Sequence, residues 1–268
     1  MLDEEPHTTM LSVFSPRLAV IGRLFFAVAL AAFGLQHLIL GRFVTRLVPP
    51  VSPWGPLPPG LSPLVGILLL AIAVCVALRV RLTAVSLGFA LSCLVSFVLL
   101  HLPIARAAGA WGGEWTSAGK ALTFCAVGLA TAGLARSGDA LDRWAGAPAL
   151  DWAARFFFAA FLVLCGIQHF LWWQFVQTLV PSWIPGPRFW TYFAAVALIA
   201  GGVGLMIPPT RRLAAALTGW MIFLWVFLVH IPRALTIRNA NETTAVFEAL
   251  AFAGLGWILA ARASSSNE

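Results

Sequence analysis

Charged residues are scarce in this chain. They make up 10% of its 268 residues, whereas a soluble domain usually carries about 25%. Lys120 is the sole lysine, so the net charge of +7 comes almost entirely from arginines that flank apolar runs. No basic run is interleaved with a soluble fold, and we expect no nucleic-acid partner. Arginines in these positions are typical of helix ends at the lipid headgroups.

The sequence also lacks cysteine pairs and the usual signatures of catalysis. It contains no C-x-x-C motif, no phosphate-binding loop and no recognisable nucleophile–base pair. Its four cysteines fall one each in separate apolar runs, as expected for buried free thiols that pack as small hydrophobes. We therefore predict no disulfide, assign no metal site and expect no catalytic activity from the chain alone. The cysteines are Cys75, Cys93, Cys125 and Cys165.

Apolar residues are abundant, at 60% of the chain, and they occur in long runs. Each run is long enough to cross about 30 Å of hydrocarbon as a helix. The runs are continuous rather than alternating, which excludes the strands of a membrane β-barrel. The sequence therefore predicts an all-α integral membrane protein with eight transmembrane helices. The eight runs are Leu18–Leu40, Leu61–Leu78, Leu82–Leu102, Gly119–Ala135, Phe156–Trp173, Phe189–Ile207, Leu213–Ile231 and Thr243–Ala261.

The second half of the sequence repeats the first. The segment RLFFAVALAAFGLQH, from Arg23 to His37, matches RFFFAAFLVLCGIQH, from Arg155 to His169. The offset is 132 residues here (169 − 37) and 128 near the end of the copy, where Lys120 matches Glu248 (248 − 120). We predict two four-helix repeats, residues 1–145 with an N-terminal tail and residues 146–268. An even number of helices per repeat gives both copies the same orientation, which is the parallel-repeat arrangement.

Basic residues set the expected orientation. Arginine and lysine are more frequent in the loops on the N-terminal side of the predicted spans than in those on the opposite side. The positive-inside rule then places both termini in the cytoplasm. We expect a multi-pass protein of the cytoplasmic (inner) membrane.

Four histidines form the main candidate site, because each lies at the outer end of a predicted helix, two per repeat. Polar side chains at this depth usually face the bundle interior, a partner or water. Three interpretations stay open. Each imidazole could bond a loop carbonyl or a carboxylate such as Glu114 or Glu242, the histidines could line a quinone head-group pocket with Gln36 and Gln168 as further donors, or they could ligate a metal or haem. The histidines are His37, His101, His169 and His230.

Lys120 and Glu248 occupy matching positions in the two copies but carry opposite charges. Isolated charges at that depth cost several kcal/mol unless they find a partner. One possibility is an ion pair between the repeats. The other is local pairing, of Lys120 with Glu114 and of Glu248 with Arg233 or Arg238.

A proline-rich loop follows the first helix of each copy. It reads RFVTRLVPPVSPWGPLPPG in the first copy and QFVQTLVPSWIPGPRFW in the second. Proline removes a backbone donor and disfavours helix in the preceding residue. Each loop is either an ordered lid over the outer mouth of its own unit or a rigid connector.

Together these motifs resemble the DoxX-like family of small four-helix membrane proteins. The second copy carries the resemblance best, and the first departs from it with Leu38 after His37 and a looser proline loop. The resemblance implies a four-helix unit and an association with respiratory or thiol redox chemistry, often as a partner subunit of a quinone-reducing or oxidative-stress complex. The matching segments are Gly166–Phe170, Val180–Trp190, Arg212–Ala214, His230–Arg233 and Glu242–Thr244.

We therefore expect a membrane subunit or accessory protein of a bacterial quinone-linked electron-transfer system. Its partners would be the lipid bilayer and other membrane or redox proteins, and its ligand a quinone, with haem as the second choice. The alternatives are a small-molecule transporter, a haem-binding membrane anchor and a non-catalytic scaffold. A transporter is expected to have broken helices at mid-membrane, whereas the prolines here lie near predicted helix ends, at Pro63, Pro103, Pro208 and Pro232.

Overall fold

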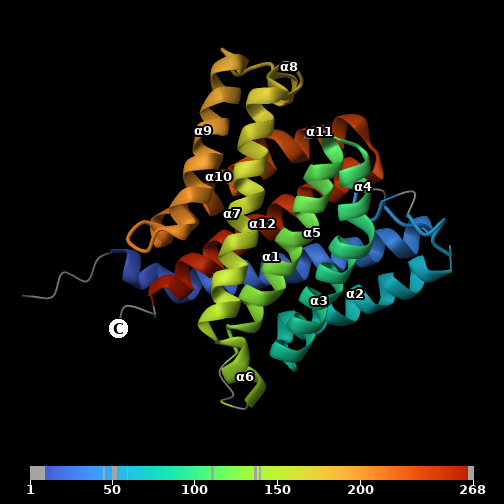
Figure 1. Cartoon of the computed structure of the whole chain (residues 1–268), viewed down its shortest axis with the longest axis vertical. Helices are drawn as coiled ribbons and strands as arrows, with labels where there is room; N and C mark the ends of the chain where they lie inside the picture. The colour runs from blue at the N-terminus through green and yellow to red at the C-terminus, as the bar shows by residue number, and fades with distance from the viewer. Residues whose placement is uncertain are drawn as a thin grey trace, which may run out of the picture.

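The computed structural model describes residues 10–44, 46–49, 53–58, 60–109, 112–135, 138 and 140–264. This part of the chain is built from helices joined by short connections (Figure 1). The helices are α1 (Met10–Leu40), α2 (Leu61–Leu78), α3 (Leu82–Ser96), α4 (Leu102–Ala107), α5 (Gly113–Ala132), α6 (Ala140–Ala145), α7 (Pro148–Leu171), α8 (Trp173–Val176), α9 (Pro187–Met206), α10 (Arg211–Trp225), α11 (Ile231–Ile237) and α12 (Ala240–Ser264).

Seven helical stretches of the described chain are long and apolar enough to cross a membrane. They show an all-α, multi-pass membrane protein. The predicted span at Gly119–Ala135 falls on α5, a helix of 20 residues with Glu114 and Lys120 in its first half. This helix is less apolar than the other seven, and much of it is buried among its neighbours. The seven stretches are Pro16–Leu40, Leu61–Leu78, Leu82–Ala107, Pro148–Leu171, Pro187–Met206, Arg211–Ile237 and Ala240–Ala263.

The third predicted helix of each copy is longer than the sequence suggested. A π-helical turn, η1 (Phe97–His101), joins α3 to α4, and the turn η3 (Val226–His230) joins α10 to α11. Pro103 has no N–H with which to bond the Leu99 carbonyl one turn earlier. That carbonyl instead accepts a hydrogen bond of 3.0 Å from the indole Nε1 of Trp54. The helix therefore continues through the proline rather than ending before it.

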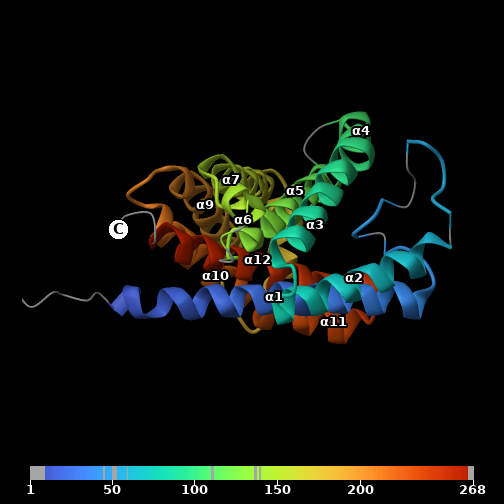
Figure 2. The same ribbon diagram turned by 90° about the horizontal axis from the view of Figure 1, so that it is seen from below.

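The longest helices pack closely and antiparallel through glycines. α1 lies between α2 and α12 (Figure 2), and a methyl group added at Gly34 would come within 2.7 Å of the Gly66 carbonyl of α2. On its other side, one added at Gly22 would come within 2.4 Å of the Gly254 carbonyl of α12. α7 lies in the same way between α9 and α5. Small residues let helix backbones approach closely where lipid gives no hydrophobic driving force.

The core lies where α1, α3, α5, α7 and α12 meet, and aromatic rings fill it. The ring of Phe124 on α5 lies 5.0 Å from that of Phe252 on α12, 5.6 Å from Phe33 and 6.4 Å from Phe89. Phe161 of α7 packs edge-on against Phe252. Such edge-to-face and tilted contacts are favourable beyond the area that they bury. The rings form a continuous apolar layer across the middle of the bundle.

The end of the bundle near α6 is held together by charges. Asp151 at the start of α7 pairs with Arg155 one turn later, and Arg262 at the end of α12 donates to Asp151 at 3.0 Å. Thr83 of α3 donates a hydrogen bond to Asp142 of α6. These contacts hold α6, which connects α5 to α7, against α3, and they hold the start of α7 against the end of α12.

Candidate functional site

Polar contacts gather at the end of the molecule where α1 ends and α12 begins. We call this the Gln36 end. The Gln36 amide donates from Nε2 to the Ala240 carbonyl at 3.2 Å, and its Oε1 accepts from the Thr244 hydroxyl at 2.9 Å. This side chain thus joins helix one of the first copy to helix four of the second.

Gln168 makes the matching contact between α7 and α5. Its Nε2 donates to the Gly112 carbonyl at 2.9 Å and its Oε1 accepts from the Thr116 hydroxyl at 2.8 Å. Gly112 and Thr116 match Ala240 and Thr244 at the offset of 128 residues (240 − 112 and 244 − 116). Both glutamines therefore bridge helices, which is a role that the sequence interpretation did not assign to them.

The Lys120 ammonium lies 2.9 Å from Glu248 Oε2, so of the two pairings that the sequence left open, the contact between the two copies is present. Glu248 is 2% exposed. The same oxygen also accepts from Arg46 Nε at 2.6 Å, and Arg46 comes from the loop that follows α1. The local alternative is wrong for these two residues. Glu114 is exposed in the first turn of α5, where a carboxylate suits the positive end of the helix dipole.

Glu242 and Arg233 form a second, local ion pair beside this cluster. The Arg233 guanidinium donates to both carboxylate oxygens, at 3.0 and 3.2 Å, in the two-pronged geometry that favours arginine. The other oxygen of Glu248, Oε1, is buried and has no hydrogen-bond partner in the described part of the chain. Buried charges within a membrane-spanning helix are costly, and they mark functional positions by default.

Two of the four histidines bond to their own helices. Nδ1 of His37 lies 2.7 Å from the Phe33 carbonyl, and Nδ1 of His169 lies 2.7 Å from the Cys165 carbonyl. His37 is 1% exposed, and its Nε2 has no partner among the described residues. The ring packs edge-on against Phe43. Among the described residues, neither of these imidazoles bonds to a loop carbonyl or to the carboxylates that the sequence suggested.

The other two histidines lie closer to the charged cluster that Arg46, Lys120 and Glu248 form. His101 is buried and lies near the Leu47 backbone and Lys120. His230 lies near the cations Arg46 and Lys120 as well as the carboxylates Glu248 and Glu242. The described contacts join no two of the four imidazoles. No described group of three or more His, Cys, Asp or Glu side chains is placed to hold a metal ion.

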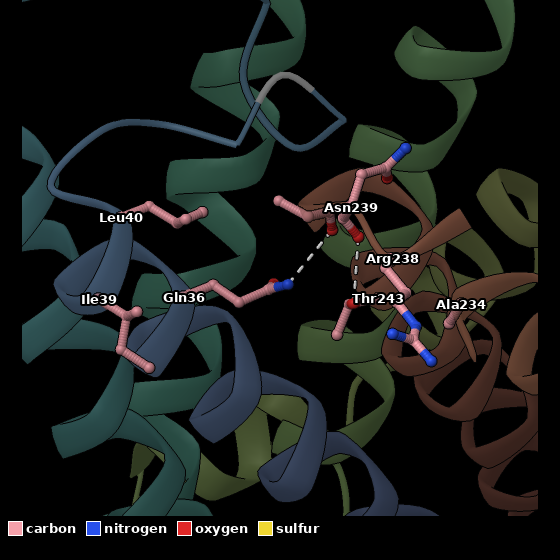
Figure 3. Close-up of a pocket in the computed structure, with 8 residues that line it drawn as sticks. Gln36, Ile39, Leu40, Ala234, Arg238, Asn239 and Thr243 are labelled. Atoms are coloured by element: carbon pink, nitrogen blue, oxygen red, sulfur yellow. Dashed lines mark hydrogen bonds between the residues drawn. The ribbon is translucent and has the colours of Figure 1, made fainter. Parts of the chain in front are cut away.

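The larger pocket of this end has a volume of about 440 Å³ and lies between the end of α1 and the corner from α11 to α12 (Figure 3). Gln36 and Leu40 extend toward it from α1, and Arg238 and Thr243 lie on the opposite wall. The remaining lining residues are Ile39, Ala234, Asn239 and Ala240. Ile39 is 79% exposed, so the pocket adjoins an exposed apolar side chain.

A left-handed residue shapes the corner that forms the second wall. Arg238 ends α11 with φ +51°, a conformation that a non-glycine residue seldom adopts. The next residue, Asn239, accepts the Glu242 backbone N–H at 2.8 Å through its side-chain oxygen and so caps the start of α12. This sharp turn sets Arg238 and Asn239 side by side at the pocket.

A smaller pocket of about 170 Å³ adjoins the first and shares Leu40, Asn239 and Ala240 with it. Its other lining residues are Arg42, Phe43, Val44 and Asn241. Asn241 Oδ1 accepts the Arg46 backbone N–H at 3.2 Å, which ties the loop after α1 to α12. The described part of this loop therefore contacts α12 of the second copy.

Of the residues predicted for the site, only Gln36 lines one of the two pockets, the larger one. Gln168, His169 and Glu114 lie elsewhere, and Glu242, Glu248 and Lys120 form the neighbouring ion pairs. The sequence interpretation missed the pocket residues Arg42, Arg238, Asn239 and Asn241. The sequence did contain a signal, because the polar residues Arg238 and Asn239 separate two apolar stretches.

Comparison with known proteins gives one match. The family model described as "Domain of unknown function (DUF8561)" matches residues 158–266, from within α7 to the end of the α12 region. No curated protein and no solved structure matches the chain. The matched segment corresponds to the second of the two sequence copies.

Proposed function

We propose that this protein is an integral membrane subunit of a quinone-linked electron-transfer system, and that it holds a quinone head group in the larger pocket at the Gln36 end. One observation carries the proposal. A pocket of about 440 Å³ with an amide, a guanidinium and a hydroxyl in its walls borders Ile39, an exposed apolar side chain. A ligand that fits both surfaces has a polar head and an apolar tail.

Quinone chemistry suits this arrangement. A quinone ring is flat and uncharged, and it accepts hydrogen bonds at carbonyl oxygens on opposite edges. The pocket offers donors from opposite walls, the Gln36 amide on α1 and the guanidinium of Arg238, which directly follows α11. One N–H of Gln36 Nε2 is used by Ala240, and a primary amide has two. Ligand sites of this kind are mostly apolar with a few placed polar groups.

The proposal includes an architecture of two four-helix units with eight spans and a parallel arrangement. Residues at matching positions face each other where α5 meets α12, both as the ion pair Lys120–Glu248 and as the ring pair Phe124–Phe252. Matching positions meet in this way near a pseudo-twofold axis. The glutamine bridges and the π-helical turns η1 and η3 also recur in both copies. The family match over residues 158–266 supports the second unit as a separate domain.

The position of the pocket supports a role beside a partner redox protein. It lies at the periphery of the bundle, next to lipid, where a neighbouring protein can approach a bound quinone. The motifs that resemble the DoxX-like family support this association. A transporter fits less well, because the ring layer of Phe33, Phe124 and Phe252 fills the bundle between the charged cluster and the α6 end.

The test uses the full-length protein, extracted with its native lipids and then titrated with a short-chain quinone in detergent. Quenching of tryptophan fluorescence gives the dissociation constant. We expect Arg238→Gln to weaken binding about tenfold, the loss of one charge-assisted hydrogen bond. Arg17→Gln removes an exposed arginine from the other end of α1 and is expected to bind as wild type does. Equal affinities in all three proteins, or no quinone in the native extract and no binding, would overturn the proposal.

A further inference from the structure

The smaller pocket differs in character from the quinone pocket beside it. Its volume, about 170 Å³, is less than half of the other. An arginine and two asparagines contribute to its lining, together with Leu40, Phe43, Val44 and Ala240, and none of its lining residues is acidic. A quinone ring with its substituents is large for such a space, whereas a tetrahedral oxyanion is compact.

We propose that this pocket binds a phosphate-type oxyanion, with Arg42 as the principal ligand. The guanidinium of arginine matches two phosphate oxygens at once, which makes arginine the preferred residue for such groups. Arg42 forms no ion pair with a carboxylate in the described part of the chain, so no described carboxylate offsets its charge. Asn239 and Asn241 supply polar atoms on the opposite wall.

The surrounding charges favour an anion as well. The two nearest ion-pair groups contain three cations, Arg46, Lys120 and Arg233, against two carboxylates, Glu242 and Glu248. This leaves one excess positive charge (3 − 2), partly buried, before Arg42 is added. Arg46 is bonded through its backbone N–H to Asn241, which lines the pocket. A bound anion would offset charge that the low dielectric makes expensive.

Two sources carry this chemistry, the head group of an acidic phospholipid and free phosphate. Leu40 lies on the shared wall of both pockets, beside the exposed Ile39. A phospholipid could therefore seat its phosphate beside Arg42 and extend its chains along the end of α1. Ordinary attraction of arginine to headgroups is general and weak in specificity, and the experiment has to separate it from a built site.

The experiment measures binding to the full-length protein in detergent by native mass spectrometry and by the shift of the unfolding temperature. Phosphatidylglycerol, phosphatidylcholine and inorganic phosphate are compared on wild type, Arg42→Gln, Arg42→Lys and Arg17→Gln. We expect phosphatidylglycerol to bind wild type more tightly than phosphatidylcholine does. Arg42→Gln should lose about tenfold of that affinity, Arg42→Lys less, and Arg17→Gln none.

Competition between phosphatidylglycerol and inorganic phosphate shows which of the two sources supplies the bound oxyanion. If inorganic phosphate displaces phosphatidylglycerol from wild type and not from Arg42→Gln, the site accepts the free anion. If phosphatidylglycerol binding depends on Arg42 without competition from phosphate, the site requires the lipid ester. Equal losses in Arg42→Gln and Arg17→Gln, or no preference for phosphatidylglycerol, would overturn the inference. Arg238→Gln separates the two proposals, because it should weaken quinone binding and leave phosphatidylglycerol binding unchanged.

Discussion

The Lys120 ammonium lies 2.9 Å from the Glu248 carboxylate, although the two residues occupy matching positions in the two sequence copies. A duplicated segment starts with the same residue at both positions, and two like charges there would repel. Opposite charges turn this contact into a bond between the copies. Arg46 adds a second cation to the same carboxylate oxygen, at 2.6 Å, and the second copy has Thr178 at the matching position (178 − 46 = 132). The junction is therefore asymmetric.

This asymmetry predicts unequal effects of removing the two partners. Glu248→Gln leaves Lys120 and Arg46 without their carboxylate, and we expect a loss of about 3–5 kcal/mol in the free energy of unfolding. Lys120→Met should cost less, because Arg46 still neutralises Glu248. Glu114→Gln, which removes an exposed carboxylate from the same helix as Lys120, should change stability by under about 0.5 kcal/mol. Unfolding in mixed micelles measures all three, and an equal cost for Glu248→Gln and Lys120→Met would contradict the role given to Arg46.

The close approach of α1 and α2 predicts a contrast between two glycines. A methyl group at Gly34 would lie 2.7 Å from the Gly66 carbonyl, whereas one at Gly88 of α3 meets no atom within 4 Å. Gly34→Ala should therefore destabilise the protein by about 1–3 kcal/mol through overpacking. Gly88→Ala should be neutral or stabilising by up to about 1 kcal/mol, since alanine favours helix. Thermal unfolding followed by circular dichroism compares them, and a stable Gly34→Ala variant would show that these helices pack less closely.

Much of the fold was predictable because hydrocarbon imposes a strong constraint on sequence. The run Leu61–Leu78 coincides with α2. The helical stretches from α3 to α4 and from α10 to α11 extend beyond the predicted runs because a π-helical turn in each accommodates the proline, and Trp54 satisfies the carbonyl that Pro103 leaves free. α5 is less apolar than the other predicted spans because a helix surrounded by protein can carry Lys120 and small polar residues without exposing them to lipid.

The site was less predictable, because it depends on distances between the copies. The repeat aligned Lys120 with Glu248, but it could not decide between a bond across the junction and two local pairs. The pockets depend on the left-handed turn at Arg238, and no sequence pattern predicted this backbone conformation. The sequence suggested Gln36 and Gln168 as donors to a ligand. In the structure their amides join helices, and of the two only Gln36 also lines a pocket.

The two glutamine bridges predict matched losses of stability. Gln36→Leu removes the bonds to Ala240 and Thr244, and Gln168→Leu removes those to Gly112 and Thr116. Bonds between membrane helices contribute about 0.6 kcal/mol on average and at most about 1.7. We expect each variant to lose an amount in that range and the double variant to lose roughly their sum. Unfolding in mixed micelles provides the values, and a large loss in one variant with none in the other would argue against equivalent bridges.

The last prediction concerns whether α5 crosses the membrane, because that decides the side on which the chain ends. α5 has 20 residues, which is long enough to span, and it packs along α7, which is apolar enough to cross by itself. Its less apolar composition is tolerable because much of its surface is buried against protein. If α5 crosses, there are eight spans and the two termini lie on the same side.

Fusion reporters distinguish the two outcomes. A green fluorescent protein at either terminus should fluoresce, and alkaline phosphatase at either terminus should be inactive, because both termini are expected in the cytoplasm. A cysteine introduced at Gly109, in a variant whose four native cysteines are replaced by alanine, should react with an impermeant maleimide in intact cells, and one at Gly138 should not. Gly109 and Gly138 lie on either side of α5. Labelling of both positions from the same side, with the termini on opposite sides, would leave seven spans and would remove the parallel orientation of the two units.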